Sequence, residues 1–280
     1  MNRYLLGLPV CLVVTPLLLY LLLHGSSSEP AAIQEKHVPE VSRTDSLPDG
    51  MRMEQLAREN PREFLKNCIR RYDRNVNSYR LTMLKREQIA GRLQPQERME
   101  VYFKDDPHSV CMIWHEGARK AERVLYVKGE NNDKMLARPN GSIQRRLVGD
   151  IVERDVDGPV ARQSGRFPLS KFGLKKSLER ALAAWEDAWE KGTLRVKYLG
   201  TEPLPQANDR ICYHLHRVAE TPEDDGVMEQ RLFIDQENWL PLRILSTGEE
   251  GKIIGEYYFL DIQVNPEFKP DQFKPAALKP

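Results

Sequence analysis

The sequence has no excess of charge of either sign, since its 280 residues hold 42 Lys and Arg against 41 Asp and Glu. Binding to a phosphate backbone depends on clustered positive charge, and the chain has no long basic stretch. It also lacks a Gly-rich phosphate loop and the Gly-x-Ser-x-Gly pattern of serine hydrolases. We therefore expect a protein that binds no nucleic acid, is not an enzyme and needs no cofactor.

Cysteine is scarce. Of the four cysteines, Cys11 falls in an apolar run, which leaves Cys68, Cys111 and Cys212. Because three is an odd number, at most one internal disulfide can form among them, and the sequence does not select the pair. Their spacing matches no zinc module.

The longest apolar run lies at the N-terminus. Tyr4–Leu23 contains 20 uncharged, mostly apolar residues, enough to span a hydrocarbon core of roughly 30 Å. Arg3 precedes the run and no basic residue follows it closely, which predicts an N-terminus in the cytoplasm. We expect residues 1–24 to be a single-pass inner-membrane anchor with the rest in the periplasm. Prolines within the run and small residues behind it leave a cleaved signal peptide as the alternative, which would release the protein into the periplasm.

The remainder divides by composition into a linker and one domain. Residues 25–50 are polar, rich in Ser and Pro, and lack periodic apolar positions, which predicts a flexible linker. Residues 51–280 should form the folded part. Asn60-Pro61 followed by Glu63 predicts a capped helix that runs to about Arg74.

Beyond this helix the apolar residues mostly alternate. Alternating runs separated by turn residues are typical of antiparallel meanders. No internal repeat and no strand–helix alternation is present. The predicted strands are residues 77–91, 98–104, 109–116, 123–129 and 133–139, then, after a helix at 173–192, residues 194–200, 210–218, 228–235, 239–246 and 252–264. The sequence thus predicts an α+β protein with about ten strands.

"QRLFIDQENWLPLRILS", residues 230–246, predicts one hairpin. Leu232 and Ile234 alternate into its turn, and Leu240, Leu242 and Ile244 alternate out of it. We expect Asp235 to bond its own backbone, Asn238 to take the left-handed conformation, and Pro241 to mark a sheet edge or a bulge.

One cluster suggests metal chemistry. Alternation along a strand places Cys212, His214 and His216 on one face, a geometry that suits zinc or copper. The same pattern fits a solvent-facing polar side of a half-buried strand. We favour the second interpretation and predict no metal, because no other histidine has ligand spacing.

A ligand cavity would need inward-facing apolar residues. Alternation places several such residues on one side of their strands, and two tryptophans lie one turn apart on the second helix. The candidates are Met99, Val101, Phe103, Met112, Trp114, Trp185 and Trp189. An ordinary helix packed on a sheet also explains the tryptophans, and we favour that interpretation for this pair.

Six segments between residues 61 and 275 together resemble the domain-of-unknown-function family 1571. Cys111 stands where an aromatic residue is expected, so the resemblance does not predict the packing there. The segments are "KREQIAGRL" (85–93), "HSVCMIW" (108–114), "VLYVKGENNDKMLARP" (124–139), "RFPLSKFGL" (166–174), "FIDQENWLPLRI" (233–244) and "YYFLDIQVNPEFKPDQFKP" (257–275).

The order of elements and the Phe273-Lys-Pro275 ending also resemble the wider lipoprotein-carrier superfamily of LolA type, which includes LolB-type receptors and RseB-type sensors. This resemblance implies an unclosed antiparallel half-barrel with helices over its concave face, around a cavity for acyl chains or apolar peptides. It implies no catalytic residues.

Together these observations predict a non-catalytic cell-envelope protein that binds a lipid, a lipoprotein acyl chain or another apolar ligand. The alternatives are an RseB-like sensor that docks a membrane or envelope protein, and a metal-dependent enzyme using Cys212, His214 and His216.

Overall fold

The computed structural model describes residues 46–223 and 225–279. The predicted anchor (1–24) and most of the predicted linker (25–50) lie outside the described residues, as does Cys11. Within the described ranges, no helix combines the length and the hydropathy needed to cross a membrane.

One antiparallel sheet of 12 strands dominates the described residues. The strands are β1 (Ser78–Ile89), β2 (Arg92–Leu93), β3 (Glu97–Lys104), β4 (Ser109–Glu116), β5 (Ala121–Val127), β6 (Lys134–Pro139), β7 (Val152–Asp155), β8 (Arg195–Leu204), β9 (Arg210–Val218), β10 (Glu229–Asp235), β11 (Pro241–Thr247) and β12 (Ile253–Val264). The order is β7-β6-β5-β4-β3-β1-β12-β11-β10-β9-β8, with β2 paired to β1. The expected α+β class and unclosed antiparallel sheet are confirmed.

The strand count corrects the expected ten. The two missed strands are β2, which has two residues, and β7, which holds three charged residues among its four. Neither is long or apolar enough to show alternation. β7 is an edge strand, where short length and charge discourage pairing with other chains.

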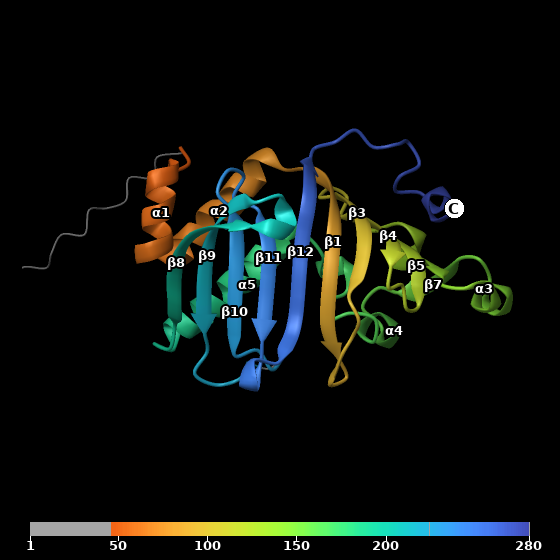
Figure 1. Ribbon diagram of the computed structural model, residues 1–280. Helices are drawn as coiled ribbons and strands as arrows, with labels where there is room; N and C mark the ends of the chain where they lie inside the picture. The colour runs from red at the N-terminus through yellow and green to blue at the C-terminus, as the bar shows by residue number, and fades with distance from the viewer. Residues whose placement is uncertain (1–45, 224, 280) are drawn as a thin grey trace, which may run out of the picture. The chain divides into compact units, whose positions relative to one another are not determined.

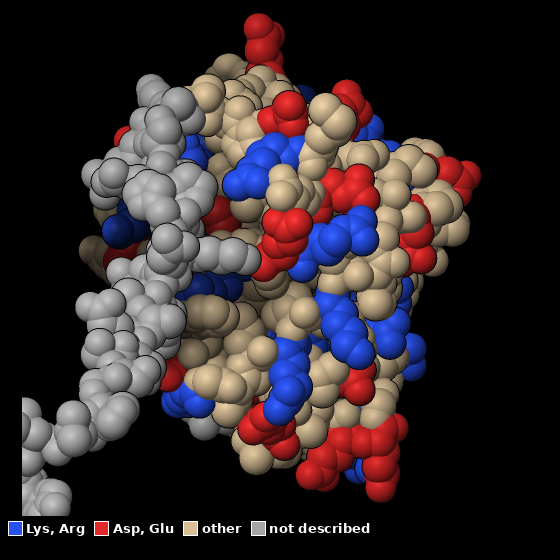
Figure 2. All heavy atoms as spheres, turned by 90° about the vertical axis from the view of Figure 1, so that its left-hand side faces the viewer, with Lys and Arg blue, Asp and Glu red and all other residues tan. Residues whose placement is uncertain are grey.

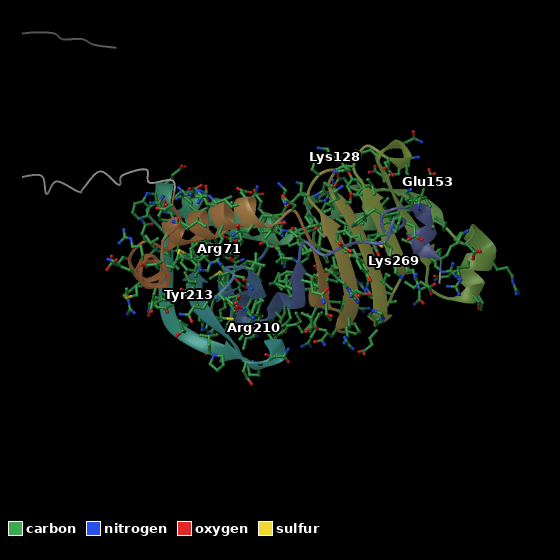
Figure 3. All side chains as sticks on the ribbon, turned by 90° about the horizontal axis from the view of Figure 1, so that it is seen from above. Arg71, Lys128, Glu153, Arg210, Tyr213 and Lys269 are labelled. Carbon is green, nitrogen blue, oxygen red and sulfur yellow. The ribbon has the colours of Figure 1, made fainter. Side chains whose placement is uncertain are left out.

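Two meanders meet in the middle of the sheet. β1 pairs with β3 on one side and with the C-terminal strand β12 on the other, so the first and last long strands join the two halves (Figure 1). Seen along the strands, Tyr213 of β9 and Lys128 after β5 mark opposite halves (Figure 3).

Helices α1 (Gly50–Glu59), α2 (Pro61–Asn75) and α5 (Leu174–Glu190) cover one face of the sheet, here called the inner face. Two short helices precede α5 in sequence: α3 (Ser142–Val148) lies between β6 and β7, and α4 (Pro159–Arg162) follows β7. The predicted cap of α2 is confirmed, because the Asn60 side chain accepts a hydrogen bond from the Glu63 amide at 3.2 Å. α1 was not predicted.

The main core lies between these helices and the inner face. It includes Leu65 of α2, Trp185 of α5, and Leu232 of β10. α5 begins where its backbone meets the sheet: the Leu174 amide donates to the Tyr79 hydroxyl at 3.1 Å. A Cβ at the preceding Gly173 would lie 3.3 Å from the Phe103 ring, so a larger residue would crowd this contact.

The opposite, outer face carries two smaller apolar clusters. Cys212 lies in one of them beneath Leu204 and Ala207, and Cys111 lies in the other beneath Leu278 of the C-terminal segment. Cys68 belongs to the main core, and all three cysteines are buried and free. The expectation that the Cys212 side of β9 faces solvent is wrong, because the segment after β8 folds over it.

The predicted hairpin is confirmed as β10 and β11, with two corrections. Asp235 Oδ2 accepts from the Asn238 amide at 2.8 Å, but Trp239, with φ 58°, takes the left-handed conformation expected of Asn238. Pro241 lies at a bulge in an interior strand, which leaves Leu242 in the outer cluster while Ile244 remains in the main core. An extra residue in one strand reverses the alternation there.

The described surface agrees with the balanced composition. On the face turned toward the viewer in Figure 2, acidic and basic residues are interspersed, without a broad field of one sign.

Candidate ligand-binding cavity

A cavity of about 1280 Å³ lies between the inner face and the segments that cover it. Strands β1, β3–β7 and β9–β12 contribute to its wall, and α5 and residues 160–172 lie across from them. This volume exceeds the roughly 300–1,000 Å³ of pockets that hold drug-sized ligands. It is large enough for a long flexible molecule.

Much of the wall is apolar. Methionines are prominent, and their flexible, unbranched side chains adapt to ligands of irregular shape. The apolar lining from the strands includes Met83, Met99, Met112, Val124, Met135, Ala137, Ile244 and Phe259.

The predicted cavity residues divide into three groups. Met99, Met112 and Trp114 line the cavity. Val101, Phe103 and Trp185 are buried in the main core and are absent from the lining. Trp189 was expected to face the sheet but is 57% exposed. It lies in the last turn of α5, and the Arg62 guanidinium lies 3.9 Å from its ring centroid.

The cavity also contains a cluster of buried charges that the sequence reasoning missed. Lys85 Nζ lies 3.4 Å from a carboxylate oxygen of Glu87 and 3.4 Å from one of Glu97. Both glutamates are buried. Buried charges are tolerated when they are paired and hydrogen-bonded, and further donors surround these two carboxylates.

Each glutamate accepts additional hydrogen bonds. The Trp114 indole and the Arg119 guanidinium donate to Glu97 at 2.7 and 2.9 Å, and the Tyr257 hydroxyl donates to Glu87 at 2.7 Å. Arg119 also donates to the Ser164 carbonyl at 2.9 Å. The cluster therefore joins β1, β3, β4 and β12 to the segment that covers the cavity.

The sequence contains a pattern that could have predicted this cluster, namely charged residues at positions that continue the apolar side of β1 and β3. On β1 the buried positions Leu81 and Met83 are followed, at the same spacing, by Lys85 and Glu87. On β3, Glu97 precedes Met99 in the same way. Charged residues of opposite sign that continue an apolar face indicate an inward-facing ion pair, but only if the strands are neighbours in this register.

The pairing registers extend this polar region across the sheet. Glu87 lies opposite Gly255, Gly255 opposite Ser246, Ser246 opposite Gln230, and Gln230 opposite Arg217. All but the glycine line the cavity. We call Glu87, Ser246, Gln230 and Arg217 the polar row. The adjacent inward row is more apolar, with Tyr257, Ile244, Leu232 and Leu215, so the wall is amphipathic.

Several apolar side chains at the cavity are exposed. Four large apolar side chains line the cavity and are also exposed: Leu147 and Val148 of α3, Val160 of α4, and Phe167. Apolar residues that gather around an opening mark a route for an apolar ligand or a contact surface.

The three metal candidates are absent from the cavity lining, and both histidines lie beside glutamates. His214 Nδ1 lies 2.6 Å from Glu202, and His216 Nε2 lies 2.9 Å from Glu229. Burial raises the pKa of the Cys212 thiol to about 12, so the free thiol stays protonated. Within residues 46–223 and 225–279, no three His, Cys, Asp or Glu side chains are grouped to hold a metal ion.

His214 should make stability depend on pH. Burial lowers the pKa of His214 below its usual value, and this outweighs the opposite effect of Glu202. The folded protein then binds fewer protons here than the unfolded chain does. We expect the unfolding free energy to fall below about pH 6.5, by up to about 1.4 kcal/mol per pH unit.

Urea titrations at neutral and acidic pH test this prediction. His214→Phe, which preserves the stacking on Phe233 at 4.3 Å between ring centroids, should flatten the profile. The exposed His115, changed to Gln, is the control and should leave it unaltered. An unchanged profile in His214→Phe would assign the pH dependence to other groups.

Comparison with known proteins places the chain in a family. The family model described as a protein of unknown function, DUF1571, matches residues 76–279. No match is found among curated proteins.

Among solved structures, the Pseudomonas aeruginosa MucA/MucB complex matches with 15% identity and a TM-score of 0.44, covering 78% of this chain and 62% of that one. The Mycobacterium tuberculosis lipoprotein LppX matches with 13% identity, a TM-score of 0.41, and coverage of 75% and 99%. A LolA superfamily protein from Nitrosomonas europaea has 9% identity, a TM-score of 0.33, and coverage of 76% and 98%. This chain therefore spans about 62% of the MucB chain. Since the family model covers residues 76–279, the protein belongs to the DUF1571 family.

Proposed function

We propose that this protein is a non-catalytic binder of an acyl chain or lipid in the cell envelope. In this proposal residues 51–280 form a half-barrel domain, which the expected N-terminal anchor and linker attach to the membrane. The observation that supports binding most directly is the cavity of about 1280 Å³ with its methionine-rich wall. Each methylene moved from water into such a wall contributes about 0.8 kcal/mol.

Native mass spectrometry of protein extracted gently from its own membranes tests this function. A co-purified lipid supports it, whereas a stoichiometric protein partner and no lipid would favour the RseB-like alternative. Protease added to spheroplasts should digest the domain, and protection would contradict the envelope location.

A cavity-filling variant tests whether the lipid occupies this space. Ala184 lies on α5, is half-buried and lines the cavity. We expect Ala184→Phe to displace about two methylenes of a bound palmitate and weaken its binding about tenfold. Binding is measured by titration, with Trp114 fluorescence as a second readout.

The neighbouring Ala183 provides a matched control, because it is exposed and absent from the lining. Ala183→Phe should bind palmitate as the natural protein does. Equal weakening in both variants would mean that the ligand lies elsewhere.

A further inference from the structure

The cavity carries more positive charge than the chain as a whole. Its lining holds eight Lys and Arg side chains but six Asp and Glu, an excess of two positive charges, whereas the entire 280-residue chain has a net charge of +1. A cavity for a neutral hydrocarbon needs no such excess, since unbalanced charge near an apolar wall is costly.

Two of these cations lie beside Phe167. The guanidinium carbons of Arg180 and Arg166 lie 4.1 and 5.8 Å from the centroid of its ring. Only Arg166 has a carboxylate partner, Asp225, at 2.5 Å. Arg180 donates to the Lys171 carbonyl at 2.9 Å and to the Ser177 hydroxyl at 3.2 Å, and forms no salt bridge with any described residue.

The charge of Arg166 is offset by Asp225, whereas Arg180 has no salt bridge of its own among the described residues. Burial lowers the pKa of Arg180 and outweighs the opposite effects of Tyr257 and Glu179, while the charge of Arg166 acts in the same direction as burial. Arginine nevertheless remains protonated in proteins. Arg180 is therefore a half-buried cation that forms no salt bridge with any residue described.

A third arginine lies at the far end of the polar row. Arg217 is 5% exposed and lines the cavity. Glu223 pairs with one of its terminal nitrogens, but its Nε, and the Oε1 of the neighbouring Gln230, are buried without a hydrogen-bond partner. Buried donors and acceptors are nearly always satisfied, so an unpaired donor on a side chain that lines the cavity indicates a missing polar partner.

We propose that the cavity binds an anionic amphiphile, whose carboxylate or phosphate is received by Arg180 and Arg166 beside the polar row while its acyl chain lies along the methionine-rich wall. The inference rests on the proposed function and names its ligand class. Guanidinium groups recognise both carboxylate and phosphate by paired, charge-assisted hydrogen bonds.

The inference about the head group is tested apart from the proposed function by comparing the binding of ligands that share a palmitoyl chain but differ in head-group charge. Calorimetry would use the full-length protein in amphipol, so that no detergent competes. The anionic ligands are palmitate and palmitoyl lysophosphatidylglycerol, and the others are zwitterionic lysophosphatidylcholine and neutral monopalmitoylglycerol. We expect the anionic pair to bind about tenfold more tightly.

Arg180→Gln should remove most of this preference without weakening monopalmitoylglycerol, whose retained binding shows that the cavity is still folded. Arg166→Gln, in the segment that precedes α5, should reduce the preference in the same way. Arg146→Gln is the control, because Arg146 is exposed and outside the lining.

Each outcome decides a separate point. Equal affinity for all four ligands, or an unchanged preference in Arg180→Gln, would overturn the anionic head group and leave acyl binding intact. Failure of every palmitoyl ligand would overturn the proposed function itself. Inorganic phosphate that binds as tightly as lysophosphatidylglycerol would show an anion site without a lipid.

Discussion

Val101→Glu is expected to abolish the cooperative thermal transition. Val101 is 0% exposed, belongs to the main core, and does not line the cavity. A carboxylate at this position would have neither water nor a basic partner, at a cost of several kcal/mol. Globular domains have a free energy of unfolding of only about 5–15 kcal/mol, so a loss of this size removes most of the stability.

Circular dichroism during heating measures this effect. The control is Val160→Glu, because Val160 is 43% exposed at the cavity and a charge there remains in water. It should change the unfolding free energy by less than about 0.5 kcal/mol. If Val101→Glu still unfolded cooperatively at the melting temperature of the natural protein, this would show that water reaches β3 and that the cavity extends deeper than described.

Lys85→Met is expected to have the second largest effect on stability. The ammonium lies between Glu87 and Glu97, and the side chains of all three residues are largely buried. Removing one partner of a buried ionic cluster leaves uncompensated charge and costs about 3–5 kcal/mol. The remaining donors, Tyr257 to Glu87 and Arg119 to Glu97, place the expected loss near the lower limit.

Chemical denaturation compares this variant with Lys104→Met, in which an exposed lysine of β3 is lost. The control should remain within about 0.5 kcal/mol of the natural protein. The double variant Lys85→Met/Glu87→Gln should recover part of the loss, since it neutralises one of the two carboxylates. Equal stability of both single variants would mean that the cluster contributes nothing to the fold.

The sequence by itself determined the elements whose evidence is local. Alternation located β4 and β9 at the boundaries that the structure shows, and a cap with a proline located the start of α2. These signals work because the direction of a side chain along a strand, and the bonding at a helix end, depend on neighbours within a few residues.

Predictions from local sequence were wrong in two situations. In one, a single extra residue reverses the alternation of a strand, and in the other, a segment from outside the strand covers its surface. The bulge at Pro241 turned Leu242 to the outer face, which periodicity cannot predict. Cys212 and His214 form an ordinary polar alternation in sequence, yet the segment after β8 buries Cys212 and Phe233 stacks on His214.

Only the tertiary structure decided the candidate site. Lys85 and Glu97 are direct cross-strand partners, but the polar row exists because β1 pairs with β12, which is far away in sequence. Whether an inward residue lines the cavity or lies in solid core depends on where the helices end: Met99 and Val101 share one side of β3, yet only Met99 reaches open space. Volume left unfilled between elements is a property of their packing, and no single segment contains it.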